Sequence, residues 1–119
     1  MKVFRVERSG DTTIVVPQGI ATEFRYFEVQ TESNTVIQQL DQHRVEKLVV
    51  DLAEVTAIDS VIIDSIIRMV RRVTNRGGKA TICGASDSAL KTLRSMRLDT
   101  LWPYFLSRDE ALQSLQEQG

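Results

Sequence analysis

Ser60 is the residue of this chain whose type and setting point most directly to chemistry. It stands in the stretch "VTAIDSVIIDSIIRMVRRV", Val55 to Val73, where a polar step meets an apolar run. A serine at a helix start lies beside unpaired N–H groups and the positive end of the helix dipole, so a phosphate on its hydroxyl would be stabilised. That phosphate would add about two negative charges beside the apolar Val61 and Ile62, enough to abolish a contact with a protein partner. Ser60 is therefore a candidate phosphorylation site.

The same position also fits a structural role. Serine and aspartate are both preferred N-caps, because their side-chain oxygens accept hydrogen bonds from the first turn of a helix. Asp59 directly precedes Ser60 and competes for this role. The residue types leave open whether Ser60 begins the helix, carries a phosphate, or does both.

The other reactive side chains give little support for catalysis. His43 stands at the end of a predicted helix, and no G-x-S-x-G segment supplies a nucleophile for it. We therefore expect a solvated histidine favoured by the helix dipole. The segment "NRGGKAT" lacks the spaced glycine of a phosphate-binding loop and leads into a strand. Cys83 lies in an apolar strand, where a free cysteine behaves as a small hydrophobe. The sequence thus predicts no enzyme and no cofactor.

A group of arginines follows Ser60 along the predicted helix. They could form an anion-binding stripe, but a surface helix needs a charged outer face and Asp64 sits among them. We therefore expect a solvated face. The arginines are Arg68, Arg71, Arg72 and Arg76.

Composition excludes several further classes of function. The chain has 119 residues, 42% of them hydrophobic and 26% charged, which predicts one folded domain over residues 1–119. The formal net charge of -1 gives no overall basic field for nucleic acid or anionic lipid. One cysteine excludes an internal disulfide, and a single histidine beside it leaves no Cys/His cluster that could hold zinc. With no signal peptide and no long apolar run, we expect a cytoplasmic protein that does not insert into membranes.

The elements that would position Ser60 are predicted from the spacing of apolar residues. This spacing switches between about two residues, typical of strands, and about 3.6 residues, typical of helices. Two short strands, "KVFRVER" and "TTIVVPQG", form a hairpin around the turn "SGD". A helix runs from about Phe24 to Arg44, and "KLVVDL" reads as an interior strand covered on both faces. A second helix spans Ser60 to Asn75 and stops at "NRGG". Its apolar stripe consists of Ile63, Ile66, Ile67, Val70 and Val73.

The remaining elements repeat this alternation to the end of the chain. "KATICGA" is a buried strand, and "SDSALKTLRSM" is a helix that begins at Ser86 or Asp87. "LWPYFL" predicts a last short strand, and "SRDEALQSLQEQ" a final helix with Ser107 and Glu110 as its capping box. The order ββαβαβαβα predicts an α/β domain with a mixed, mostly parallel sheet and an antiparallel hairpin at one side.

With this order, the central motif "VTAIDSVIIDSIIRMVRRVTNRGGKATICGAS" resembles a STAS domain, the family of bacterial anti-anti-sigma factors. The strand "KLVVDL", the helix "SALKTLRSM" and the closing "LWPYFLSRDEAL" extend the resemblance from about Val3 to Leu115. In this family the serine of the Asp-Ser pair is phosphorylated, which here implies Ser60. The resemblance implies a non-enzymatic signalling protein that binds an anti-sigma factor acting as serine kinase, and a phosphatase that removes the phosphate.

The resemblance also implies a partner-binding surface and a second acceptor. The expected surface residues are Asp59, Ser60, Val61, Ile62, Asp64, Gly84 and Ser86. The form "IDSVIID" is closer to members that build the stressosome, where another acceptor lies in the next helix and Thr92 is its nearest equivalent. Sporulation-type members have a small, Gly-containing segment where this chain has Val61 and Ile62.

Other features of the chain differ from the family pattern. The acidic residue that many members carry after their second strand is displaced here to Glu23, and the segment "EFRYFEVQTES" is longer than usual. We expect this segment to make partner contacts of its own. A constitutive adaptor or scaffold subunit, of the stressosome or lipid-transporter type, is the alternative function, and a homo-oligomer is left open.

Overall fold

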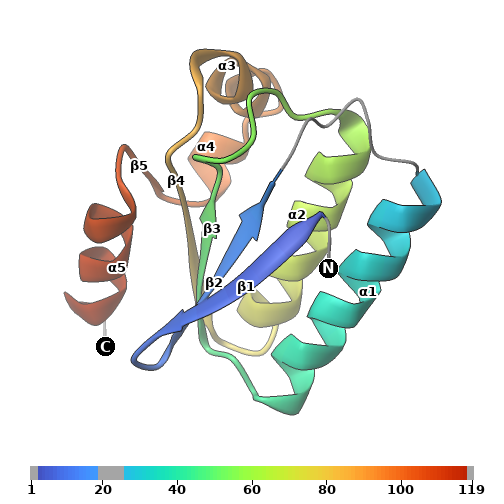
Figure 1. Ribbon diagram of the computed structural model, residues 1–119. Coiled ribbons are helices and arrows are strands. Elements are labelled where there is room, and N and C mark those ends of the chain that lie inside the picture. Colours follow the sequence, from blue (N-terminus) through green and yellow to red (C-terminus); the bar gives the residue numbers. More distant parts are fainter. Residues whose placement is uncertain (1–2, 19–25, 118–119) are drawn as a thin grey trace.

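A mixed sheet of five strands runs through the computed structural model, which describes residues 3–18 and 26–117 (Figure 1). The strands lie in the order β1-β2-β3-β4-β5, with β1 antiparallel to β2 and all later neighbours parallel. They span β1 Phe4–Ser9, β2 Thr12–Pro17, β3 Lys47–Asp51, β4 Lys79–Cys83 and β5 Tyr104–Phe105. The predicted hairpin therefore occupies one edge, and the apolar β3 lies in the middle of the sheet as predicted.

The helices follow the predicted order with one addition. They span α1 Tyr26–Gln42, α2 Ser60–Thr74, α3 Asp87–Ser95, α4 Leu98–Leu101 and α5 Arg108–Glu117. The short α4 was not predicted, because four residues are too few to show a helical period. Its last residue, Leu101, is the first residue of the predicted strand "LWPYFL". Only Tyr104 and Phe105 of that segment pair with β4. The predicted helix start at Phe24, like Glu23, lies outside the described residues.

Helices cover both faces of the sheet, and each face has its own core. Successive residues of β3 point to opposite faces: Leu48 and Val50 join the larger core with α1 and α2, and Val49 joins the smaller core under α5. Figure 1 shows α1 and α2 side by side on one face and α5 on the other. Burial on both faces explains why "KLVVDL" is continuously apolar.

Arginines of α2 and of the turn that follows it hold this helix against α1. Arg68 donates to the hydroxyl of Ser33 at 2.6 Å, and Arg72 forms an ion pair with Asp41 at 2.6 Å. Arg76 pairs with the same aspartate at 2.9 Å. The expected solvated face is present, since Arg72 and Arg76 are exposed, but all three arginines also contact α1. The sequence pattern could not show these contacts with α1, since the partner residues lie more than 30 positions earlier in the chain.

Candidate functional site

The loop between β3 and α2 carries the central motif, and apolar anchors hold it in place. Leu52 is fully buried, and its backbone N–H donates to the carbonyl of Cys83 at 2.9 Å. Val55 and Ile58 are also buried in the larger core. The loop is thus fixed at both ends and in its middle before it reaches Asp59.

Asp59, not Ser60, is the N-cap of α2. Its backbone is extended, with φ at -100° and ψ at 178°, and its Oδ1 accepts a hydrogen bond from the N–H of Ile62 at 2.9 Å. Ser60 is the first residue of the helix and is exposed. Its hydroxyl has no hydrogen-bond partner among the described residues. Asp59 therefore makes the cap, and the hydroxyl of Ser60 takes no part in it.

The residues that follow Ser60 differ in what they offer at the surface. Val61 is half-buried and packs against the larger core, while Asp64 is exposed and lies 3.6 Å from Arg68. Ile62 is fully buried, so the prediction that it contacts a partner is wrong for this conformation. Its side chain belongs to the apolar stripe that anchors α2 to the sheet, one residue earlier than the stripe recognised in the sequence.

The loop between β4 and α3 is bonded to the loop that carries Asp59. Ser86 is the N-cap of α3, where its Oγ accepts from the N–H of Ala89 at 3.1 Å. The same Oγ donates to the carbonyl of Thr56 at 2.6 Å. One hydroxyl thus caps a helix and holds together the two loops that were expected to form the partner surface.

Gly84 allows a close approach beneath these loops. Its φ of +73° lies in the left-handed region, and a Cβ at this position would stand 2.9 Å from Oδ1 of Asp51. Its own N–H donates to the carbonyl of Phe105 at 3.2 Å. In this structure Gly84 therefore supports the start of the loop, and a direct contact with a partner stays a prediction.

Asp51 organises a charged cluster that the sequence did not reveal. It is 5% exposed, and its carboxylate accepts from the N–H of Ala53 at 3.0 Å and from Nε of Arg108 at 2.8 Å. Arg108 also donates to Glu7 at 3.1 Å, and this hydrogen bond holds the pKa of Glu7 below its ordinary value. The cluster ties α5 and β1 to the end of β3, from which the loop departs.

Arg5 extends this cluster to the loop itself. It forms ion pairs with Glu7 and with Glu54, which lies three residues after Asp51. The hydrogen bond from Arg5 lowers the pKa of Glu54. The only sequence signal for this cluster was an acidic residue at the end of the apolar run "KLVVD", where an apolar residue would also have fitted.

The remaining reactive residues have environments that suit structural roles. Cys83 is buried, and burial raises the pKa of its thiol to about 12. Thr92 is half-buried on α3, and its hydroxyl donates to the carbonyl of Ser88 at 3.2 Å. Across residues 3–18 and 26–117, no group of His, Cys, Asp and Glu side chains could hold a metal ion. In the same ranges no helix has the length and apolar character to span a bilayer.

Comparisons with known proteins identify the type of domain. The model of the STAS domain family matches residues 5–111. No curated protein sequence matches the chain. Among solved structures, an anti-sigma factor antagonist from Mycobacterium paratuberculosis has a TM-score of 0.78 at 18% identity, over 95% of this chain and 92% of that one.

Two further structures show the same arrangement. A variant of RsbS from Moorella thermoacetica has a TM-score of 0.80 at 17% identity, with 97% of this chain and 96% of that chain covered. The phosphorylated form of SpoIIAA, a cell fate determinant of Bacillus, has a TM-score of 0.71 at 14% identity, with 93% and 97% covered. At these identities the likeness is one of fold.

Proposed function

The chain belongs to the STAS domain family, and we propose that it is a non-enzymatic signalling protein of the anti-sigma factor antagonist type, switched by phosphorylation of Ser60. Its proposed partner is an anti-sigma factor that also acts as a serine kinase, and a phosphatase restores the free hydroxyl. The cycle would take place in the cytoplasm. The fold it shares with anti-sigma factor antagonists, including the phosphorylated SpoIIAA, supports this proposal.

One observation carries the proposal: the hydroxyl of Ser60 is exposed and unused. Asp59 makes the capping hydrogen bond to Ile62, so a phosphate on Ser60 would remove no bond that the fold needs. The bulky residues after Ser60 leave it open to a kinase, because Ile62 points into the core and Val61 is half-buried.

The charges around Ser60 explain how a phosphate would act as a switch. The first turn of α2 contains no acidic side chain, but Asp59 precedes it and Asp64 lies one turn further on. A phosphate would be stabilised mainly by the free N–H groups of the first turn. It would make the surface around Val61 strongly negative, and a partner that packs on this half-buried valine would be repelled.

The proposed partner surface is smaller than the one expected from the sequence. It contains Asp59, Ser60, Val61 and Asp64, together with the adjoining loop at Gly84 and Ser86. Ile62 is left out because it has no exposed area. Thr92 stays a weaker second acceptor, since its hydroxyl already donates within α3.

Incubation of the purified chain with its cognate kinase and ATP tests the switch. Mass spectrometry should find one phosphate on Ser60 in the wild type and none in Ser60→Ala. Ser88→Ala is a matched control, because Ser88 is also exposed in the first turn of a helix. Phosphate found only at other residues, or unchanged incorporation in Ser60→Ala, would rule out the proposed acceptor.

Binding to the anti-sigma factor separates the switch from a constitutive adaptor. Ser60→Asp places a negative charge where the phosphate would stand, so it should weaken the complex at least about tenfold, whereas Ser88→Asp should not. Calorimetric titration measures both. Equal affinity of the wild type and Ser60→Asp would instead favour an adaptor that docks without a phosphate switch.

A further inference from the structure

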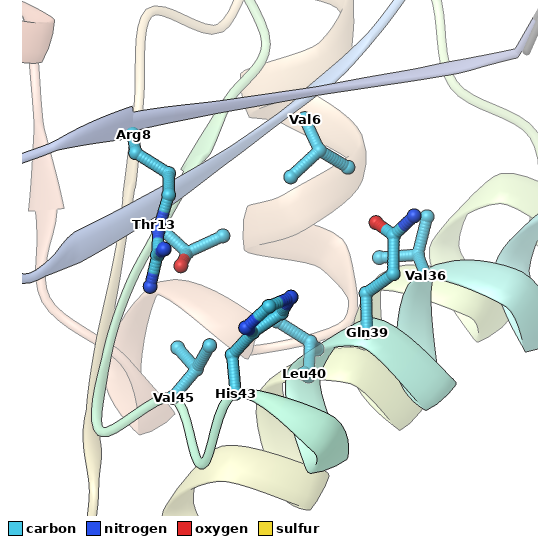
Figure 2. A pocket seen from close by; sticks show the side chains of 8 residues that line it. All are labelled: Val6, Arg8, Thr13, Val36, Gln39, Leu40, His43 and Val45. Carbon is cyan, nitrogen blue, oxygen red and sulfur yellow. The ribbon is translucent and has the colours of Figure 1, made fainter.

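A cavity of about 350 Å³ opens between the hairpin and the C-terminal half of α1, and the proposed switch does not use it (Figure 2). Thr13 and Val45 line it at the N-terminal ends of the parallel strands β2 and β3. Ser60 follows the C-terminal end of β3. The cavity and the phosphorylation site therefore lie at opposite ends of the sheet.

The inner wall of the cavity is apolar. Val36 and Leu40 contribute to it from α1, Val45 from the turn before β3, and the half-buried Val6 from β1. The volume is near the lower end of the range of roughly 300 to 1,000 Å³ that is usual for sites of small molecules. A short aliphatic group fits such a wall.

Polar side chains surround the same space, and the fold does not use them. Figure 2 shows Arg8, Thr13, Gln39 and His43 directed toward it from β1, β2 and the end of α1. Within residues 3–18 and 26–117 none of these four side chains forms a hydrogen bond or an ion pair. Thr13 is only 4% exposed as a residue, and its hydroxyl can donate to or accept from a ligand or water in the cavity.

The geometry points to a binding site for a small aliphatic monocarboxylate. Arg8 supplies the permanent positive charge, and a guanidinium binds a carboxylate through two parallel hydrogen bonds. The hydroxyl of Thr13 and the amide of Gln39 are further donors. The described lining contains no aspartate or glutamate that would favour a cation. The aliphatic tail would lie against Val6 and Val45.

Titration of the full chain with octanoate, followed by backbone amide NMR, tests this site. Octanoate should give saturable shifts at Val6, Gln39 and Val45. Octanol, which lacks the charge, should bind at least tenfold more weakly, and octylamine should give no saturable shift. Absence of saturation with octanoate at millimolar concentration, shifts centred elsewhere, or equal binding of octylamine would overturn the assignment.

Two variants make the test specific to the cavity. Arg8→Gln should weaken octanoate binding at least tenfold, while Arg94→Gln, which removes an exposed charge from α3, should leave it unchanged. Gln39→Trp should fill the mouth and abolish binding without removing any charge. Wild-type affinity in both Arg8→Gln and Gln39→Trp would show that octanoate binds at another place.

Discussion

The carboxylate of Asp59 bridges over Ser60 to accept a 2.9 Å hydrogen bond from the N–H of Ile62. Loss of an N-cap costs about 1 kcal/mol, so Asp59→Ala should lower the free energy of unfolding by this amount and Asp59→Ser should largely preserve it. Ser60→Ala should change it by less than about 0.5 kcal/mol, because the hydroxyl makes no bond within the described chain. Urea unfolding monitored by circular dichroism measures all three. A larger loss in Ser60→Ala than in Asp59→Ala would contradict the division of roles.

Gly84 should be the least replaceable of the glycines with positive φ. Gly84→Ala requires a left-handed alanine and places its Cβ 2.9 Å from Oδ1 of Asp51, so we expect a loss of at least about 2 kcal/mol. Gly10→Ala is the control: its φ of +61° is similar, but the space around it is open, and about 1 kcal/mol should be lost. Thermal unfolding compares the two. Equal losses would mean that the contact with Asp51 relaxes freely.

Arg76, two residues after α2, should contribute more to stability than the arginines within that helix. It donates to the carbonyls of Leu40 at 2.7 Å and Val45 at 2.9 Å, where α1 ends and the chain turns toward β3. Arg76→Gln removes these bonds and should cost about 1–3 kcal/mol. Arg71→Gln changes an exposed residue of α2 and should cost less than about 0.5 kcal/mol. Similar unfolding midpoints for both variants in urea would contradict the proposed role of Arg76.

Glu7 should make the stability of the chain sensitive to acid. Arg108 holds the pKa of Glu7 below its ordinary value of 4.5 in the folded chain, so the unfolded chain binds this proton at a higher pH. The stabilisation is therefore complete above 4.5 and is lost as the pH falls through the lower, folded value. Glu7→Gln should reduce the loss of stability between about pH 5 and pH 3, and Arg108→Gln should do the same. An unchanged acid dependence in both variants would show that other carboxylates cause it.

Much of the fold could be predicted from local patterns, because most elements bury a face that shows in the sequence. "KLVVDL" is apolar throughout and lies in the middle of the sheet, and the stripe of α2 gave that helix within one residue of its observed end. Ile62 was missed from the stripe although it stands four residues before Ile66. The helical spacing of Ile62 was therefore visible in the sequence. The four residues of α4, in contrast, were too few to show a helical period.

The candidate site was less predictable, since its supports come from distant parts of the chain. Which of Asp59 and Ser60 caps α2 depends on the backbone angles at Asp59, and either residue type could have done so. The bond from Arg108 to Glu7 joins residues 101 positions apart. The cavity likewise needs β1, β2 and α1 to converge, and the sequence around His43 suggested only a solvated helix end.

The division of labour between Asp59 and Ser60 has an evolutionary consequence. Since folding constrains Asp59 and not Ser60, a single substitution at position 60 can delete or restore the proposed phosphate acceptor in an otherwise intact domain. Descendants of one ancestral module can therefore gain or lose a regulated contact without passing through an unstable intermediate. Stability measurements on Ser60 variants would not detect such a change. Measurements of their binding to partners would.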